Sequence, residues 1–136
     1  VRLDMPVGEG SKLFPPHQDY SYNRGSDNSI VVWMPLQDTD VNNGCLKYSP
    51  HSHEGGFIKG ITPKTDRLEG MILSGDYEWE DAPMLAGEVL LFSMYLVHKS
   101  GANSTKDTIR FTIQVRYNDL ADNNFAERGF KPLEEF

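Results

Sequence analysis

Short apolar runs, separated by Gly, Pro, Asn and Asp, are the main pattern along this 136-residue chain. The runs are rich in β-branched and aromatic residues, and no stretch shows convincing helical periodicity. This pattern is typical of an all-β sandwich or barrel rather than a helical bundle. The predicted strands cover residues 2–6, 14–20, 29–36, 46–49, 88–94, 96–100 and 109–117.

The last predicted strand has the clearest alternation. One face carries Ile109, Phe111, Ile113, Val115 and Tyr117, and the other carries Arg110, Thr112, Gln114 and Arg116. Two interpretations of the polar face compete. It meets solvent, the commoner case for an antiparallel strand, or it lines a wet cavity inside a barrel with Arg110 pointing inward. The strand alone favours solvent, whereas the histidines upstream favour the cavity.

Two segments connect elements rather than build the barrel. Residues 55–85 are long for a loop in a small barrel, so this connection is expected to be functional or to carry a short element of its own. The acidic run 76–81 within it is interpreted as a solvated loop. Residues 118–136 are expected to form an irregular tail that could lie across the barrel mouth.

Composition and charge narrow the function classes. The chain is 38% hydrophobic and 24% charged, as expected for one globular domain over residues 1–136. A net charge of -7 with scattered Lys and Arg argues against a nucleic-acid partner. The longest apolar run, 89–97, is too short to span a membrane. The single cysteine, Cys45, favours a reducing, cytoplasmic location. Because the chain does not begin with Met, we expect a fragment of a longer protein.

Candidate metal ligands occur at two distant places. Residues two apart on a strand point the same way, so His17 and Asp19 are expected to project together while Gln18 turns aside. His98, at the end of an apolar strand, can supply a third ligand. Two histidines and one carboxylate form the ligand set of a non-haem iron(II) site with open positions. His51 and His53 are rival ligands, but their Pro- and Ser-rich surroundings indicate a turn.

An ordered series of motifs resembles the phytanoyl-CoA dioxygenase family of iron(II)- and 2-oxoglutarate-dependent oxygenases. The motifs are HQD at 17–19, WMPLQD at 33–38, NGCL at 43–46, SPHSH at 49–53, AGEVLLF at 86–92 and HKSGANS at 98–104, with Arg110 beyond them. The resemblance implies a double-stranded β-helix, the jelly-roll barrel of cupins. It further implies that His17, Asp19 and His98 bind iron.

The same resemblance implies the binding mode of the co-substrate. Arg110 is expected to pair with the distal carboxylate of 2-oxoglutarate, helped by the hydroxyl of Ser100. Trp33 matches a tryptophan that lies near the co-substrate. The glycines Gly44 and Gly87 are expected at tight turns.

The chain departs from the family pattern at two points. His51 stands where members commonly have glycine. The spacing from His98 to Arg110 is one residue longer than expected, which leaves Arg116 as a second candidate for the carboxylate clamp. We also expect a fragment that lacks the helical N-terminal region usual in the family.

The function implied is hydroxylation of a small organic substrate by dioxygen, with release of succinate and CO2. Asp19 favours hydroxylation, because related halogenases lack a carboxylate at this ligand position. The alternative is a non-catalytic jelly roll that binds sugars, in which Trp33, Tyr77 and Trp79 would stack on the ligand. The sequence reveals neither the substrate nor the oligomeric state.

Overall fold

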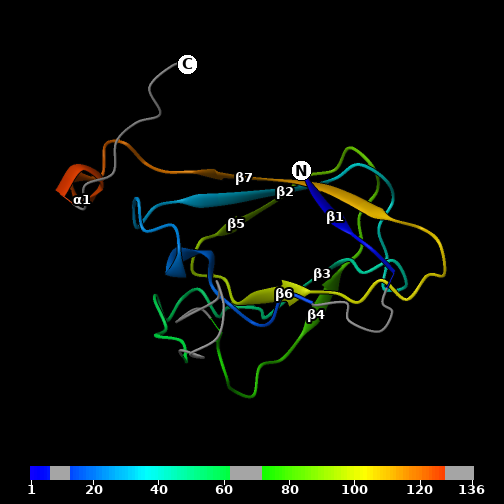
Figure 1. Cartoon of the computed structure of the whole chain (residues 1–136). Helices are drawn as coiled ribbons and strands as arrows, with labels where there is room; N and C mark the ends of the chain where they lie inside the picture. The colour runs from blue at the N-terminus through cyan, green and yellow to red at the C-terminus, as the bar shows by residue number, and fades with distance from the viewer. Residues whose placement is uncertain (7–12, 62–71, 128–136) are drawn as a thin grey trace.

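The strands form two antiparallel sheets that face each other, as the computed structural model shows (Figure 1). The structure describes residues 1–6, 13–61 and 72–127. The larger sheet has the order β1-β7-β2-β5, with β1 at Arg2–Asp4, β7 at Arg110–Tyr117, β2 at Ile30–Pro35 and β5 at Leu90–Ser93. The smaller sheet has the order β4-β3-β6, with β4 at Glu80–Ala82, β3 at Leu46–Tyr48 and β6 at His98–Ser100. This architecture confirms the predicted all-β double-stranded β-helix.

The predicted strand 14–20 is wrong over most of its length. His17 makes a single antiparallel bridge with His98, and the chain then enters a 3-10 helix, η1, at Asp19–Ser21. The backbone N–H groups of Ser21 and Tyr22 donate to the carbonyls of Gln18 and Asp19. The turn therefore satisfies locally the groups that a continued strand would present to a neighbour.

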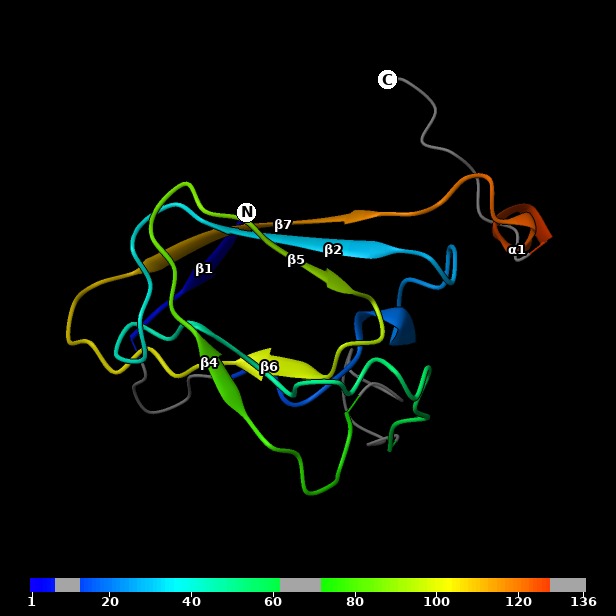
Figure 2. The same cartoon turned by 180° about the vertical axis from the view of Figure 1, so that it is seen from behind.

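Two elements lie within the connecting segments, and the first is the short element that residues 55–85 were expected to carry. Strand β4 lies within the 55–85 connection and includes the end of the acidic run, so the prediction of a solvated loop is wrong there. Opposite charges compensate across its pairing with β3, since Lys47 Nζ lies 2.5 Å from Asp81 Oδ1. Helix α1, Asn123–Glu127, lies in the predicted irregular tail, where Asp122 Oδ1 accepts the backbone N–H of Asn124 (Figure 2). Residues 62–71 and 128–136 of these two segments lie outside the described residues.

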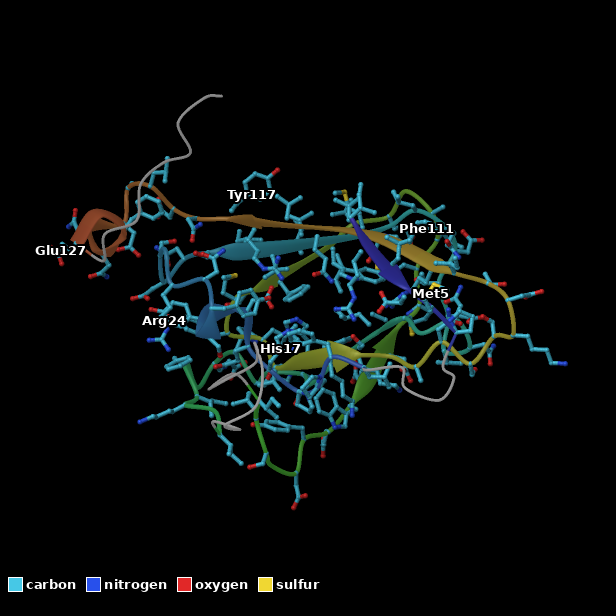
Figure 3. All side chains as sticks on the ribbon, viewed as in Figure 1. Met5, His17, Arg24, Phe111, Tyr117 and Glu127 are labelled. Atoms are coloured by element: carbon cyan, nitrogen blue, oxygen red, sulfur yellow. The ribbon has the colours of Figure 1, made fainter. Side chains whose placement is uncertain are left out.

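The space between the sheets receives apolar side chains from β2 and polar side chains from β7. On β2, Val31 and Trp33 are each 1% exposed and belong to the core cluster, together with Leu46, Phe92 and Met94. On β7 the polar face points inward: Arg110 and Thr112 are buried, whereas Tyr117 is exposed on the outer side (Figure 3). The interpretation of this face as the lining of a cavity is confirmed.

Two predicted turn glycines have left-handed backbone. Gly44 has φ +85° and Gly87 has φ +91°, conformations that cost little only without a Cβ. A Cβ at Gly44 would also lie 2.7 Å from the backbone oxygen of Gly101. Within the described ranges, no helix has the length and apolar character needed to cross a bilayer.

Candidate metal centre

Three potential metal ligands converge between the two sheets. The Nε2 atoms of His17 and His98 lie 3.2 Å and 3.4 Å from Oδ1 of Asp19. One ligand atom from each residue lies within 4.8 Å of the other two, and all three residues are buried. The structure therefore brings together the two sequence positions, eighty residues apart in the chain, that the sequence nominated.

Backbone pairing sets the relative position of the two histidines. The N–H of each donates to the carbonyl of the other at 3.0 Å, so their rings emerge side by side with centroids 4.1 Å apart. Gln18 does turn aside, and it anchors the segment that carries the ligands. Its side-chain amide donates to the carbonyls of Gly56 and Tyr95, and its oxygen accepts the N–H of Ile58.

The hydrogen bonds at the far side of each ring orient the histidines. Nδ1 of His17 lies 2.8 Å from the carbonyl oxygen of Pro15, and Nδ1 of His98 lies 3.0 Å from that of Leu96. Since a carbonyl only accepts, these contacts place a proton on each Nδ1 and turn the Nε2 atoms toward Asp19. Burial and the neighbouring His98 lower the pKa of His17 to about 4, so its ring is neutral at pH 7. Neutral imidazole is the form that binds metals.

Asp19 is held as a carboxylate by partners around it. Its Oδ2 accepts a 2.7 Å hydrogen bond from Nε of Arg116, and its Oδ1 accepts one from the Tyr22 hydroxyl. Burial alone would raise the pKa of Asp19, but the contacts with both imidazoles and the charge of Arg116 keep it well below its usual range. The Nε2 atoms of both imidazoles and a carboxylate oxygen of Asp19 thus point at one another. This donor set fits a divalent cation.

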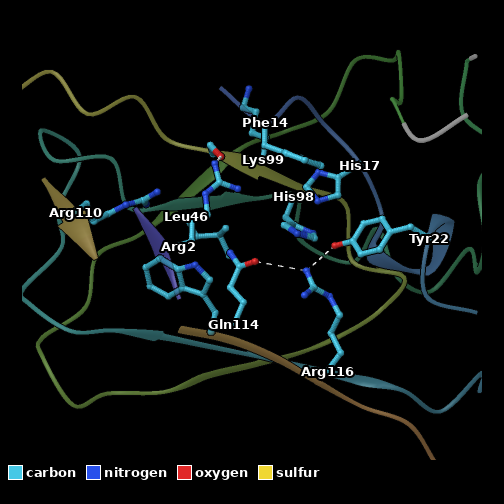
Figure 4. Close-up of a pocket in the computed structure, with 12 residues that line it drawn as sticks. Arg2, Phe14, His17, Tyr22, Leu46, His98, Lys99, Arg110, Gln114 and Arg116 are labelled. Carbon is cyan, nitrogen blue, oxygen red and sulfur yellow. Dashed lines mark hydrogen bonds between the residues drawn. The ribbon is translucent and has the colours of Figure 1, made fainter. Parts of the chain in front are cut away.

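A cavity of about 330 Å³ extends from the ligand cluster toward Arg110 (Figure 4). Trp33 and Ser100 line it, as do His17 and His98. The cavity therefore contains, or directly adjoins, every residue that the sequence nominated for the metal or the co-substrate.

Arg110 is 2% exposed and already has protein partners. Its Nη2 forms a 2.6 Å ion pair with Oδ2 of Asp4, and its Nη1 donates to the carbonyl of Gly44. Its buried Nε has no hydrogen-bond partner among the described residues. The Cζ of Arg110 lies 5.8 Å from the ring centroid of Trp33. An unpartnered buried N–H donor beside a cavity fits a carboxylate ligand.

Arg116, the second candidate for the clamp, lies at the other end of the cavity. Its Nε and Nη2 bind Asp19 and Tyr22, the latter at 2.5 Å. Its guanidinium group therefore orients the carboxylate of the metal cluster, while Arg110 lies at the end remote from that cluster (Figure 4). This arrangement favours Arg110 as the clamp.

The rival histidines lie outside the cluster. Both are exposed, and Nδ1 of His51 contacts Oε1 of Glu54 at 2.8 Å. His51 has φ +60°, which explains why glycine suits this position. Between them, the hydroxyl of Ser52 donates to the carbonyl of Ser49 and accepts the N–H of Val97, which holds this turn in place.

Sequence reasoning missed several residues that line or flank the cavity, among them Tyr22, Arg2 and Asp4. Arg2 and Asp4 share one side of β1, and the β1–β7 register places Asp4 opposite Arg110. Nε and Nη2 of Arg2 donate to Asp4, and Nη2 also donates to Ser100 Oγ at 2.9 Å. The alternation Arg-Leu-Asp was the available signal, because Leu3 separates two residues that must share a face.

A jelly roll with two histidines and a carboxylate beside an arginine-lined cavity is the architecture of the 2-oxoglutarate-dependent non-haem iron oxygenases. Comparison with protein families agrees with this class. The family description "Phytanoyl-CoA dioxygenase (PhyH)" matches residues 5–112. The chain belongs to this family.

Two relatives show the range of the family. The methylphosphonate hydroxylase of Gimesia maris is 30% identical over 130 residues, which cover 96% of this chain and 47% of that protein. The human peroxisomal phytanoyl-CoA dioxygenase is 32% identical over 114 residues, which cover 76% of this chain and 34% of that protein. The chain thus spans about half the length, or less, of these relatives.

Solved structures share the fold. EvdO2 from Micromonospora carbonacea var. aurantiaca matches with a TM-score of 0.69 at 25% identity, covering 84% of this chain and 47% of that one. The epimerase SnoN, solved with Fe3+, alpha ketoglutarate and nogalamycin RO, matches with a TM-score of 0.58 at 25% identity, covering 85% of this chain and 46% of that one. Iron and 2-oxoglutarate are therefore the cofactor and co-substrate to which the site of this chain corresponds.

Proposed function

We propose that this chain is the catalytic barrel of an iron(II)- and 2-oxoglutarate-dependent dioxygenase that hydroxylates a small organic substrate. The observation that carries the proposal is the convergence of two imidazoles and one carboxylate on a common point, with ligand atoms within 4.8 Å of one another. Family membership supports the same reaction class.

In this proposal His17, Asp19 and His98 hold the iron, and Asp19 is kept in position by Arg116 and Tyr22. When bound, iron and 2-oxoglutarate supply the oxidising chemistry. The overall reaction balances: one oxygen atom of O2 enters succinate and the other enters the substrate as a hydroxyl group, while the 2-oxoglutarate carboxyl group leaves as CO2.

Arg110 would bind the distal carboxylate of 2-oxoglutarate, through its unpartnered Nε and by sharing the N–H groups that now contact Asp4. The hydroxyl of Ser100 and the ring of Trp33 would complete this end of the cavity. A buried guanidinium group suits this role because it stays charged and offers several donors in one plane.

The first substrate to test is methylphosphonate. The hydroxylase named for it matches 96% of this chain, more than the 76% matched by the human phytanoyl-CoA enzyme.

Succinate formation tests the proposal. We expect the full chain with Fe(II), O2 and 2-oxoglutarate to release succinate, and to release it faster with its substrate. Asp19→Ala and His98→Ala should abolish this release, whereas His53→Ala, at an exposed histidine outside the cluster, should retain it. Succinate release that survives both substitutions in the cluster would contradict the proposal.

A further inference from the structure

The charges around the cavity exceed what iron and 2-oxoglutarate require. Iron(II), one carboxylate ligand, one arginine and the 2-oxoglutarate dianion would balance to zero. Among the described residues, Arg2 and Arg116 add two positive charges at this cavity and Asp4 adds one negative charge. One positive charge is therefore left in excess. An excess positive charge in a chain of net charge -7 indicates a second anionic ligand. The ammonium of Lys99 is not counted with this set, because it lies 3.8 Å from the ring centroid of Trp79 and its charged neighbours are Lys47 and Asp81.

Arg2 is the arginine best placed to receive that second ligand. Arg116 is committed to Asp19 and Tyr22, and Arg110 lies buried at the end of the cavity. The side chain of Arg2 is 30% exposed, and its contacts with the described residues use Nε and Nη2. Its Nη1 amine is therefore left to donate to a ligand.

Asp4 fixes the two guanidinium groups side by side. Its carboxylate accepts from Nε of Arg2 at 3.0 Å and from Nη2 of Arg110 at 2.6 Å, and its side chain is 12% exposed. One arginine can thus hold the co-substrate while its neighbour holds another anion. A cavity of about 330 Å³ lies at the small end of the usual range for ligand pockets, roughly 300–1,000 Å³. The second anion must therefore be compact.

From these observations we infer that Arg2 binds an oxyanion group of the substrate, a phosphonate or a carboxylate, and so selects small anionic substrates. This inference rests on the proposed function. Arg2 would orient the substrate, with its C–H bonds toward the metal cluster, and take no part in proton transfer.

Binding measured without turnover tests the role of Arg2. The full chain, loaded with Fe(II) and 2-oxoglutarate under nitrogen, is titrated calorimetrically with methylphosphonate, with propionate, and with uncharged dimethyl methylphosphonate. We expect one of the two anions to bind, and this result also distinguishes phosphonate from carboxylate as the preferred group. Arg2→Gln should weaken that binding about 10- to 100-fold, the range for losing one charged hydrogen bond. The uncharged ester should bind weakly to both proteins.

Matched variants separate this role from structural damage. Arg24→Gln removes the same charge from an exposed residue that lies over Phe57, outside the cavity, and should leave anion affinity unchanged. Arg2→Lys keeps the charge and should restore part of the affinity. The affinity for 2-oxoglutarate, titrated separately, should fall much less than the anion affinity in Arg2→Gln, because Arg2 reaches that end of the cavity only through Ser100 and Asp4. Circular dichroism checks that this variant is folded.

Three results would overturn the inference while leaving the proposed function intact. They are unchanged anion affinity in Arg2→Gln, equal weakening of 2-oxoglutarate and anion binding in that variant, or binding of the uncharged ester as tightly as the anions. Failure of the unsubstituted chain to bind Fe(II) and 2-oxoglutarate would instead overturn the proposed function itself.

Discussion

Substituting Gly44 tests how tightly the loop behind the arginine clamp is packed. The carbonyl of Gly44 accepts a hydrogen bond from Arg110, and its backbone has φ +85°. In Gly44→Ala the added Cβ would lie 2.7 Å from the oxygen of Gly101 and 2.9 Å from the nitrogen of Asn103. Both are backbone atoms, so neither can rotate away as a flexible side chain would.

Gly87 provides a matched control for this substitution. Its φ is +91°, and an added Cβ would have no atom within 4 Å. Gly87→Ala therefore measures the cost of left-handed backbone alone, roughly 1–2 kcal/mol, less about 0.4–1 kcal/mol from the reduced entropy of the unfolded chain. Gly44→Ala adds the cost of overpacking, about 1–3 kcal/mol. We expect a total destabilisation of about 1–5 kcal/mol for Gly44→Ala.

Urea unfolding of the full chain and both variants measures the difference. Gly44→Ala should also weaken 2-oxoglutarate binding, because the displaced carbonyl supports Arg110, whereas Gly87→Ala should not. Equal unfolding free energies for the two variants would refute the close approach of the Gly44 and Gly101 segments.

Three further substitutions probe stability near the site. Burial alone would raise the pKa of Asp4, but Arg2 and Arg110 lower it below 3.8. The stability that the ionised Asp4 carboxylate contributes is therefore present above pH 3.8 and is lost as the pH falls below it. Asp4→Asn should cost about 1–3 kcal/mol at pH 7 and progressively less below pH 3.8 in urea titrations. Thr112→Val should stabilise by about 1 kcal/mol, because the buried hydroxyl has no partner among the described residues. His51→Gly, at φ +60°, should stabilise by up to about 1 kcal/mol.

A specific stability result would contradict each of these three predictions. A stability loss in Asp4→Asn that does not shrink in acid would show that the carboxylate charge is unimportant. Destabilisation by Thr112→Val would reveal a partner for its hydroxyl, and destabilisation by His51→Gly would show that the pair with Glu54 outweighs the backbone cost.

The sequence was most informative where one pattern determined one geometry. A run of β-branched and aromatic residues predicted β2, alternation predicted β7, and the upstream histidines predicted that Arg110 points inward, as it does. The separation of His17 and Asp19 by one residue also predicted that their side chains converge. The predicted cause was wrong, because Asp19 begins a 3-10 turn rather than continuing a strand.

Features that depend on distant pairing were not predictable from local pattern. The sequence of β4, Glu-Asp-Ala, lacks β-branched residues, and it becomes a strand through cross-strand partners such as Lys47. Likewise, nothing local to Arg2 and Asp4 shows that β1 pairs with β7 beside Arg110. The position of Arg2 beside the cavity, on which the inferred selectivity for anions rests, is set by this pairing of β1 with β7.

Iron binding is the measurement that tests the central claim most directly. Anaerobic titration of the full chain with Fe(II) should give one bound ion per chain. His98→Ala and Asp19→Ala should each weaken binding at least 100-fold, while substitution of the exposed residues His51 and His53 by Ala should leave it unchanged. Stoichiometric iron binding that survives loss of Asp19 or His98, or that is lost with His51 or His53, would contradict the account.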